Sequence, residues 1–90
     1  MKIGQSELDK AIDDLETGDW RSAHEIVQVD DESALACWAH GIVHLMEGDE
    51  ANGRYWFRKA RRPFQEGVSI EQEISALKST AEMERKKGSA

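Results

Sequence analysis

A chain of 90 residues, 39% hydrophobic and 33% charged, can build one small hydrophobic core and is too apolar to remain disordered. Its single cysteine, Cys37, rules out an internal disulfide, and no run of about 18 apolar residues could span a bilayer. We therefore expect a single cytoplasmic domain over residues 1–87 with a frayed tail at 88–90, and no membrane partner.

Charge is distributed unevenly along the chain. Residues 1–50 carry three basic and thirteen acidic groups (−10), and residues 51–90 carry nine basic and five acidic groups (+4), which gives the net −6. Because phosphate backbones are bound by clustered lysine and arginine side chains, the acidic half argues against a nucleic-acid partner. An acidic protein or peptide at the basic end, or self-association into a homo-oligomer, is compatible with this distribution.

The first half of the chain predicts two short helices. Ser6, with an aspartate three residues later, resembles a capping box, and apolar residues then recur at helical spacing over about 6–17. Gly18 should end this helix. Asp19 is a suitable N-cap for a second helix at about 20–29.

The second half predicts three more helices. A third should run over about 33–46 and end at Gly48, and Asp49 should cap a fourth over 50–61. After a loop, an amphipathic stretch over about 70–86 predicts the last helix.

An internal repeat organises these helices. The segments LETGDWRSA (15–23) and LMEGDEANG (45–53) share leucine, glycine, aspartate and a final small residue at an offset of thirty. In each segment the small residue, Ala23 or Gly53, should let two helices approach closely. We therefore predict an all-α fold of about five helices, with two antiparallel hairpins and a C-terminal helix that covers the open end.

The repeated pattern resembles tetratricopeptide-like helical repeats. Residues 20–64 are also similar to a small all-helical family, uncharacterised in function, that reads Trp-x-x-Ala-His, then Trp-x-His-x-x-x-His-x-x-Glu-Gly-Asp-x-x-Asn-x-x-Tyr-Trp. Gly53 stands in place of an expected alanine, a departure that should loosen the fourth helix. The resemblance implies a fold and no activity. The matching positions are Trp20, Ala23, His24, Trp38, His40, His44, Glu47, Gly48, Asp49, Asn52, Tyr55 and Trp56.

A polar seam crosses the third predicted helix, which is otherwise apolar on almost every side. His40, His44 and Glu47 follow one another at i, i+4 and i+7, so they share one face. One interpretation is that the histidine rings are bonded within the core and tie the hairpin together. The other is a ligand site, because imidazoles four residues apart can reach one zinc ion and His24 could add a third nitrogen.

No catalytic pattern accompanies this seam. The first histidine of the pair is not followed by glutamate, so the metalloprotease motif is missing, and no nucleophile with an adjacent base is evident. From the sequence we therefore assign no catalytic residue, no metal ligand and no cofactor. The candidate ligand-binding residues are His24, His40, His44, Glu47, Asn52, Tyr55 and Trp56.

The fourth predicted helix carries a basic stripe. Arg54, Arg58 and Arg61 stand at i, i+4 and i+7 near the helix C-terminus, where the helix dipole favours cations. They are the candidate partner-binding residues, since arginine also recognises acidic groups.

Two functions follow as expectations. The first is a non-enzymatic, helical-repeat protein-interaction module. The alternative is a small-ligand or metal-binding protein, or an enzyme, that uses the polar seam formed by His24, His40, His44 and Glu47. For stability, we expect His44 to matter more than His40, on the assumption that the third helix packs mainly through its Trp38 side.

Overall fold

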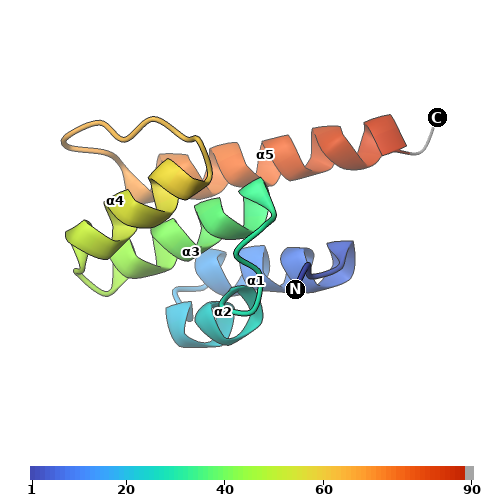
Figure 1. Ribbon diagram of the computed structural model, residues 1–90, viewed down its shortest axis with the longest axis horizontal. Helices are drawn as coiled ribbons and strands as arrows, with labels where there is room; N and C mark the ends of the chain where they lie inside the picture. The colour runs from blue at the N-terminus through green and yellow to red at the C-terminus, as the bar shows by residue number, and fades with distance from the viewer. Residues whose placement is uncertain (89–90) are drawn as a thin grey trace.

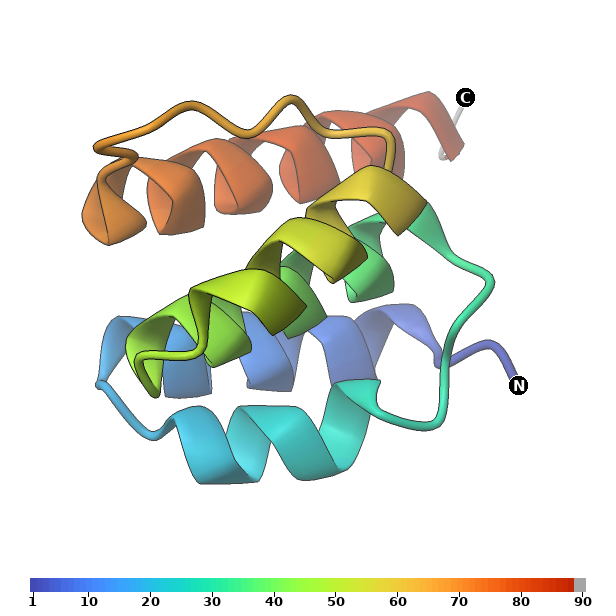
Figure 2. The same ribbon diagram turned by 60° about the vertical axis from the view of Figure 1, so that its left-hand side comes forward.

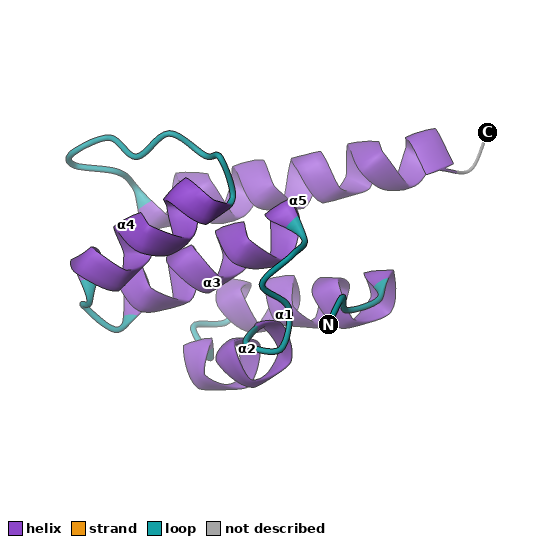
Figure 3. Cartoon of the chain, in the orientation of Figure 1, coloured by secondary structure: helices purple, strands orange, loops and turns teal. Residues whose placement is uncertain are grey.

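Five α-helices account for the regular structure of residues 1–88, the part of the chain that the computed structural model describes (Figures 1 and 3). No strand occurs within this range, so the predicted all-α fold is confirmed. The predicted tail begins at the last residue of α5, and its residues 89 and 90 lie outside the described part. None of the described helices is long and apolar enough to cross a membrane. The helices are α1 (Gln5–Glu16), α2 (Trp20–Val27), α3 (Ala34–Met46), α4 (Glu50–Lys59) and α5 (Ile70–Gly88).

Helix ends differ from the prediction by one or two residues; α2, for example, stops at Val27 where about 29 was expected. Two of these differences have a visible cause. The N-cap of α1 is Gly4 and not Ser6, because the backbone N–H of Gly4 donates to the Glu7 carboxylate at 3.0 Å. At the other end of the molecule, α4 stops at Lys59, two residues early. There Arg61 adopts a left-handed backbone conformation with φ of 59°, which no α-helix can include.

The two predicted hairpins use the same turn. Gly18 and Gly48 both have left-handed backbone conformations, with φ of 85° and 87°. In each turn the N–H of the following aspartate donates to the carbonyl five residues earlier at 2.8 Å, the bond of a Schellman motif. Asp19 and Asp49 then cap the next helix by accepting the backbone N–H three residues further on. The offset of thirty therefore describes a real structural repeat.

A pair of glycines lets α3 and α4 lie close together. A Cβ atom on Gly41 would stand 2.4 Å from a ring carbon of Phe57, and one on Gly53 would stand 2.6 Å from a methyl carbon of Leu45. Both distances are well inside van der Waals contact, so a side chain at either position would force its neighbour to move. That movement is harder for the fully buried Phe57 than for the flexible, partly buried Leu45. The small residue predicted at 53 therefore lets α3 and α4 lie close together.

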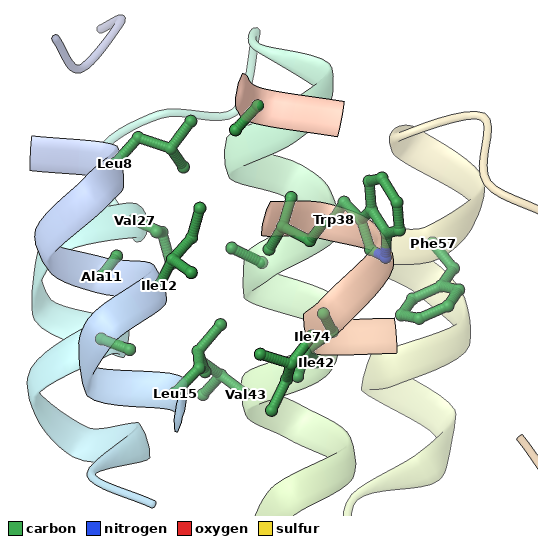
Figure 4. Packing of buried hydrophobic residues seen from close by; sticks show 14 residues of the cluster. Leu8, Ala11, Ile12, Leu15, Val27, Trp38, Ile42, Val43, Phe57 and Ile74 are labelled. Atoms are coloured by element: carbon green, nitrogen blue, oxygen red, sulfur yellow. The ribbon is translucent and has the colours of Figure 1, made fainter. Parts of the chain in front are cut away.

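Helix α3, which the sequence shows to be apolar on almost every side, is the centre of the fold. It packs against each of the other four helices, and the core in Figure 4 brings together side chains from all five. Helix α5 contacts α1 and α3 but neither α2 nor α4, and Figure 2 shows it along the opposite edge of the molecule from α2. The polar seam of α3 meets α2 and α4, because His40 contacts His24 of α2 and Trp56 of α4.

A buried polar network fixes the loop between α4 and α5. The Glu73 carboxylate accepts the Trp38 indole N–H at 3.1 Å and two guanidinium N–H groups of Arg62 at 3.2 and 2.9 Å. The guanidinium also lies over the Trp38 ring, 4.3 Å from its centroid. This network anchors the start of α5 on α3 and explains why the covering helix stays in place.

Candidate functional site

Three histidine side chains converge between α2 and α3. His24 comes from α2, and His40 and His44 stand one turn apart on α3. The His24 ring lies 4.9 Å from that of His40 and 5.6 Å from that of His44, and the two α3 rings are 4.9 Å apart. One ring nitrogen of each residue lies within 4.8 Å of the other two. The structure therefore gathers the three histidines that the sequence singled out.

The packing of α2 explains how His24 reaches the pair. Ala23 and Val27 are fully buried and form the face of α2 that meets the core. His24 follows Ala23 directly and is half-buried, so it stands at the edge of this face, beside α3. The sequence predicted a close helix approach at Ala23, and the complete burial of this small side chain is compatible with it.

His40 is the innermost member of the cluster. It is only 4% exposed, and its Nδ1 is buried without a hydrogen-bond partner among the described residues. Burial, together with the neighbouring His44 and His24, lowers the pKa of His40 to about 3. The ring is therefore neutral at pH 7, the form in which imidazole binds metal ions. The interpretation of both α3 histidines as bonded core groups is wrong for this nitrogen of His40.

His44 is held by a carboxylate. Its Nδ1 lies 2.5 Å from Oε1 of Glu47, which caps the C-terminus of α3. A carboxylate on one imidazole nitrogen fixes the orientation of the ring and leaves the other nitrogen, Nε2, for a ligand. This is the arrangement that commonly supports a metal-bound histidine.

Trp56 covers the cluster from α4. Its indole ring is stacked on the His40 ring, with centroids 3.9 Å apart and planes at 12°. Tyr55 is 48% exposed and meets Trp56 edge-on at 5.2 Å. Asn52 does not join them, because its side chain donates to the Asp49 carboxylate at 2.7 Å. Of the three candidates on α4, only Trp56 therefore touches a histidine of the cluster.

A second group of possible metal ligands overlaps the first. Oxygen atoms of Glu47 and Asp49 lie within 4.8 Å of a ring nitrogen of His44. Both carboxylates, however, already have partners: Glu47 binds His44, and Asp49 accepts two hydrogen bonds from Asn52 that lower its pKa. The three-histidine group is the one whose donor atoms are available.

The three candidate arginines do not form one stripe. Arg54 donates to Glu50 at 3.1 Å and lies over the ring of Phe64. Arg61 falls beyond the end of α4, in the left-handed turn. The Arg58 side chain is exposed and makes no hydrogen bond or ion pair with any described residue. The basic surface is thus reduced to Arg58 and its neighbours at the end of the helix.

Comparisons with protein families, with curated proteins and with solved structures find no match to this chain. Its function must therefore be argued from the histidine cluster and the surfaces around it.

Proposed function

We propose that this protein binds a transition-metal ion, and zinc in particular, through ring nitrogens of His24, His40 and His44. One observation carries the proposal: three imidazole nitrogens lie within 4.8 Å of one another, and the most buried ring has a nitrogen without a partner. Buried polar atoms nearly always have a partner, so an unpartnered imidazole nitrogen beside two others supports a site that binds a ligand.

The spacing is close to that of a zinc centre. Zinc binds histidine nitrogens at about 2.0 to 2.1 Å, which places the nitrogens of a tetrahedral centre about 3.4 Å apart. The present nitrogens can reach this spacing by small side-chain rotations, since His24 and His44 are at the edge of the core and only His40 is fully enclosed. The Glu47 carboxylate would hold His44 in place and partly balance the charge of the ion.

The choice of metal follows from the donor atoms. Three neutral imidazoles suit zinc, copper, nickel and cobalt, whereas calcium and magnesium require oxygen ligands. The carboxylates that could have provided such oxygens are bound to His44 and Asn52.

A direct titration tests this proposal. Protein stripped with a chelator should take up about one equivalent of zinc, and at about 100 times the dissociation constant the ion should add about 2.7 kcal/mol to the free energy of unfolding. His24→Ala, His40→Ala and His44→Ala should each weaken binding at least tenfold. Glu25→Gln, on the exposed side of α2 beside His24, is the matched control and should bind as wild type does. Uptake below about a tenth of an equivalent, with no change in melting temperature, would refute the proposal.

A second candidate function rests on Arg58. We infer that the chain can also act as a non-enzymatic, tetratricopeptide-like interaction module of the cytoplasm that binds an acidic protein or peptide at the C-terminal end of α4. Support comes from the exposed guanidinium of Arg58, which has no ion-pair partner among residues 1–88, and from the exposed Arg61 nearby. Arg54, the third candidate, already has acidic partners in Glu50 and Glu66.

The second candidate can be tested with a labelled oligoglutamate peptide. Arg58→Glu should weaken peptide binding at least fivefold, because it replaces an attractive charge with a repulsive one. Lys2→Glu makes the same change in net charge on the exposed N-terminal segment and should have little effect. Equal losses in the two variants would show that only the overall charge matters and would remove this surface as a docking site.

A further inference from the structure

The number of donors at the histidine cluster leaves one coordination position unfilled. Zinc in proteins takes four ligands, and a site with three protein ligands keeps its fourth position for water or an exogenous group. Within residues 1–87, the donors that gather here are the three imidazoles. Cys37, the only thiol, is buried and does not belong to the group.

The nearby carboxylates cannot easily supply the fourth ligand. Moving Glu47 onto the ion would break its 2.5 Å contact with His44, which orients that ligand. Moving Asp49 would remove the N-cap of α4, where its two oxygens accept from the backbone and side chain of Asn52. Each change would break an existing interaction of the folded chain.

The burial of the three rings shows which way the free position points. His40 is at the bottom of the cluster, 4% exposed and covered by Trp56, whereas His24 and His44 are both partly exposed. An ion held by all three therefore has protein behind it, on the His40 side, and solvent in front. Helix α5 packs against neither α2 nor α4 and contributes no donor atom to the cluster.

Resting on the proposed metal site, we infer that the three-histidine centre keeps a solvent-facing coordination position that takes a small anion in exchange for water. The charge at the centre favours this ligand class. Three neutral imidazoles leave both positive charges on the ion, and Glu47 balances one of them from outside the coordination sphere. A monodentate anion is the ligand that neutralises the remaining charge.

Cobalt substitution and azide provide the test. Cobalt(II) replaces zinc in imidazole sites, and its visible spectrum reports changes in its ligands. In cobalt-loaded protein, azide should shift the visible bands in a saturable, one-to-one manner. Arg58→Ala and Lys59→Ala, cations on the neighbouring surface of α4, should leave this titration unchanged because the anion binds the ion itself. Glu47→Gln, measured at saturating cobalt, should tighten azide binding several-fold by removing the compensating charge.

The possible failures are distinguishable. If cobalt and zinc bind in one equivalent but tens of millimolar azide leave the spectrum unchanged, the fourth position is closed and this inference is wrong, while the proposed metal site stands. If azide binding instead disappears in Arg58→Ala or Lys59→Ala, the anion binds the surface and the inference is again wrong. If neither metal binds, the proposed function and the inference both fail.

Discussion

The indole ring of Trp56 lies parallel to the imidazole ring of His40, 3.9 Å from it, and joins α4 to α3 at the centre of the histidine cluster. Stacking of this kind would be satisfied equally well by an apolar or aromatic side chain at position 40. Histidine instead introduces a buried Nδ1 without a hydrogen-bond partner in the described structure. Packing therefore explains why a flat or bulky group stands here, and it leaves the choice of histidine unexplained.

The first prediction concerns the replacement of His40 by leucine. In chelator-treated protein, His40→Leu should change the free energy of unfolding by less than about 1 kcal/mol, or raise it, because an unpartnered polar group is removed while most of the volume is kept. Zinc binding should be lost. Urea melts and zinc titrations of the same preparation measure both effects. Unchanged or higher stability together with lost zinc binding is typical of a residue that is kept for function at the expense of stability.

His40→Ala is the comparison that separates volume from polarity. It leaves a cavity under Trp56 and should cost about 2 kcal/mol in the absence of metal. His44 is less buried, with a side chain 12% exposed, so His44→Ala should cost less, which reverses the order expected from the sequence. A leucine variant that is as unstable as the alanine variant would mean that His40 has a structural partner after all.

The second prediction concerns the crossing of α3 and α4. Gly41→Ala should lower the free energy of unfolding by about 1 to 3 kcal/mol, because its Cβ would stand 2.4 and 2.8 Å from two ring carbons of the fully buried Phe57. Urea denaturation measures the loss. In the double variant Gly41→Ala/Phe57→Leu, part of the clash is relieved. The loss of unfolding free energy in the double variant should therefore be smaller than the sum of the losses in the two single variants. Strict additivity would show that the ring does not cause the strain.

The hairpins were predictable because their signals are local. Gly18 and Gly48 end α1 and α3 in the left-handed conformation that glycine adopts at little cost, and the next residue, Asp19 or Asp49, starts the following helix. The end of α4 uses the same turn with Arg61 in the glycine position. Non-glycine residues rarely adopt this conformation, so the sequence pattern extended the helix two residues too far.

The candidate site was predictable only in part. Helical spacing was enough to place His40 and His44 on one face, and His24 could be named as a third nitrogen. Which ring is innermost depends on how α2 and α4 pack on α3, and a helix that is apolar all round gives no periodicity from which to infer this. The unpartnered Nδ1 of His40 is likewise a product of tertiary packing and has no signal in the sequence.

The third prediction uses the left-handed Arg61. Arg61→Gly should stabilise the protein by about 0.5 to 1 kcal/mol. Glycine avoids the steric cost that an L-side chain bears at φ near 60°. The conformational entropy that glycine gains in the unfolded chain offsets only part of this gain. Arg58→Gly is the matched control. It lies inside α4, where the same change should destabilise by about 1 kcal/mol. Thermal or urea melts that show the same sign for both variants would contradict this account of the turn.

The last prediction concerns Asp30, a fully buried carboxylate that joins the N-terminal segment to the loop before α3. Its oxygens accept backbone N–H groups from Ile3 at 3.0 Å and from Glu32 and Ser33 at 2.9 Å each. Burial by itself would raise the pKa of this carboxyl, but these hydrogen bonds favour the charged form more strongly and lower the pKa to about 2. The ionised carboxylate therefore stabilises the folded chain.

Because the pKa of Asp30 is lower in the folded than in the unfolded chain, its contribution is complete above pH 4 and is lost as the pH falls from about 4 to 2. The difference between a pKa of about 2 and the ordinary value of 3.8 corresponds to roughly 2 kcal/mol of stability.

Asp30→Asn should therefore lower the free energy of unfolding by at least about 2 kcal/mol at pH 7, and its deficit relative to wild type should shrink towards pH 2. Asp31→Asn, an exposed neighbour paired only with Lys59 at 3.8 Å, should cost less than about 0.5 kcal/mol at neutral pH. Urea melts at pH 7, 4 and 2.5 measure the three proteins, and a deficit for Asp30→Asn that stays constant over this range would show that the hydrogen bonds do not depend on the charge.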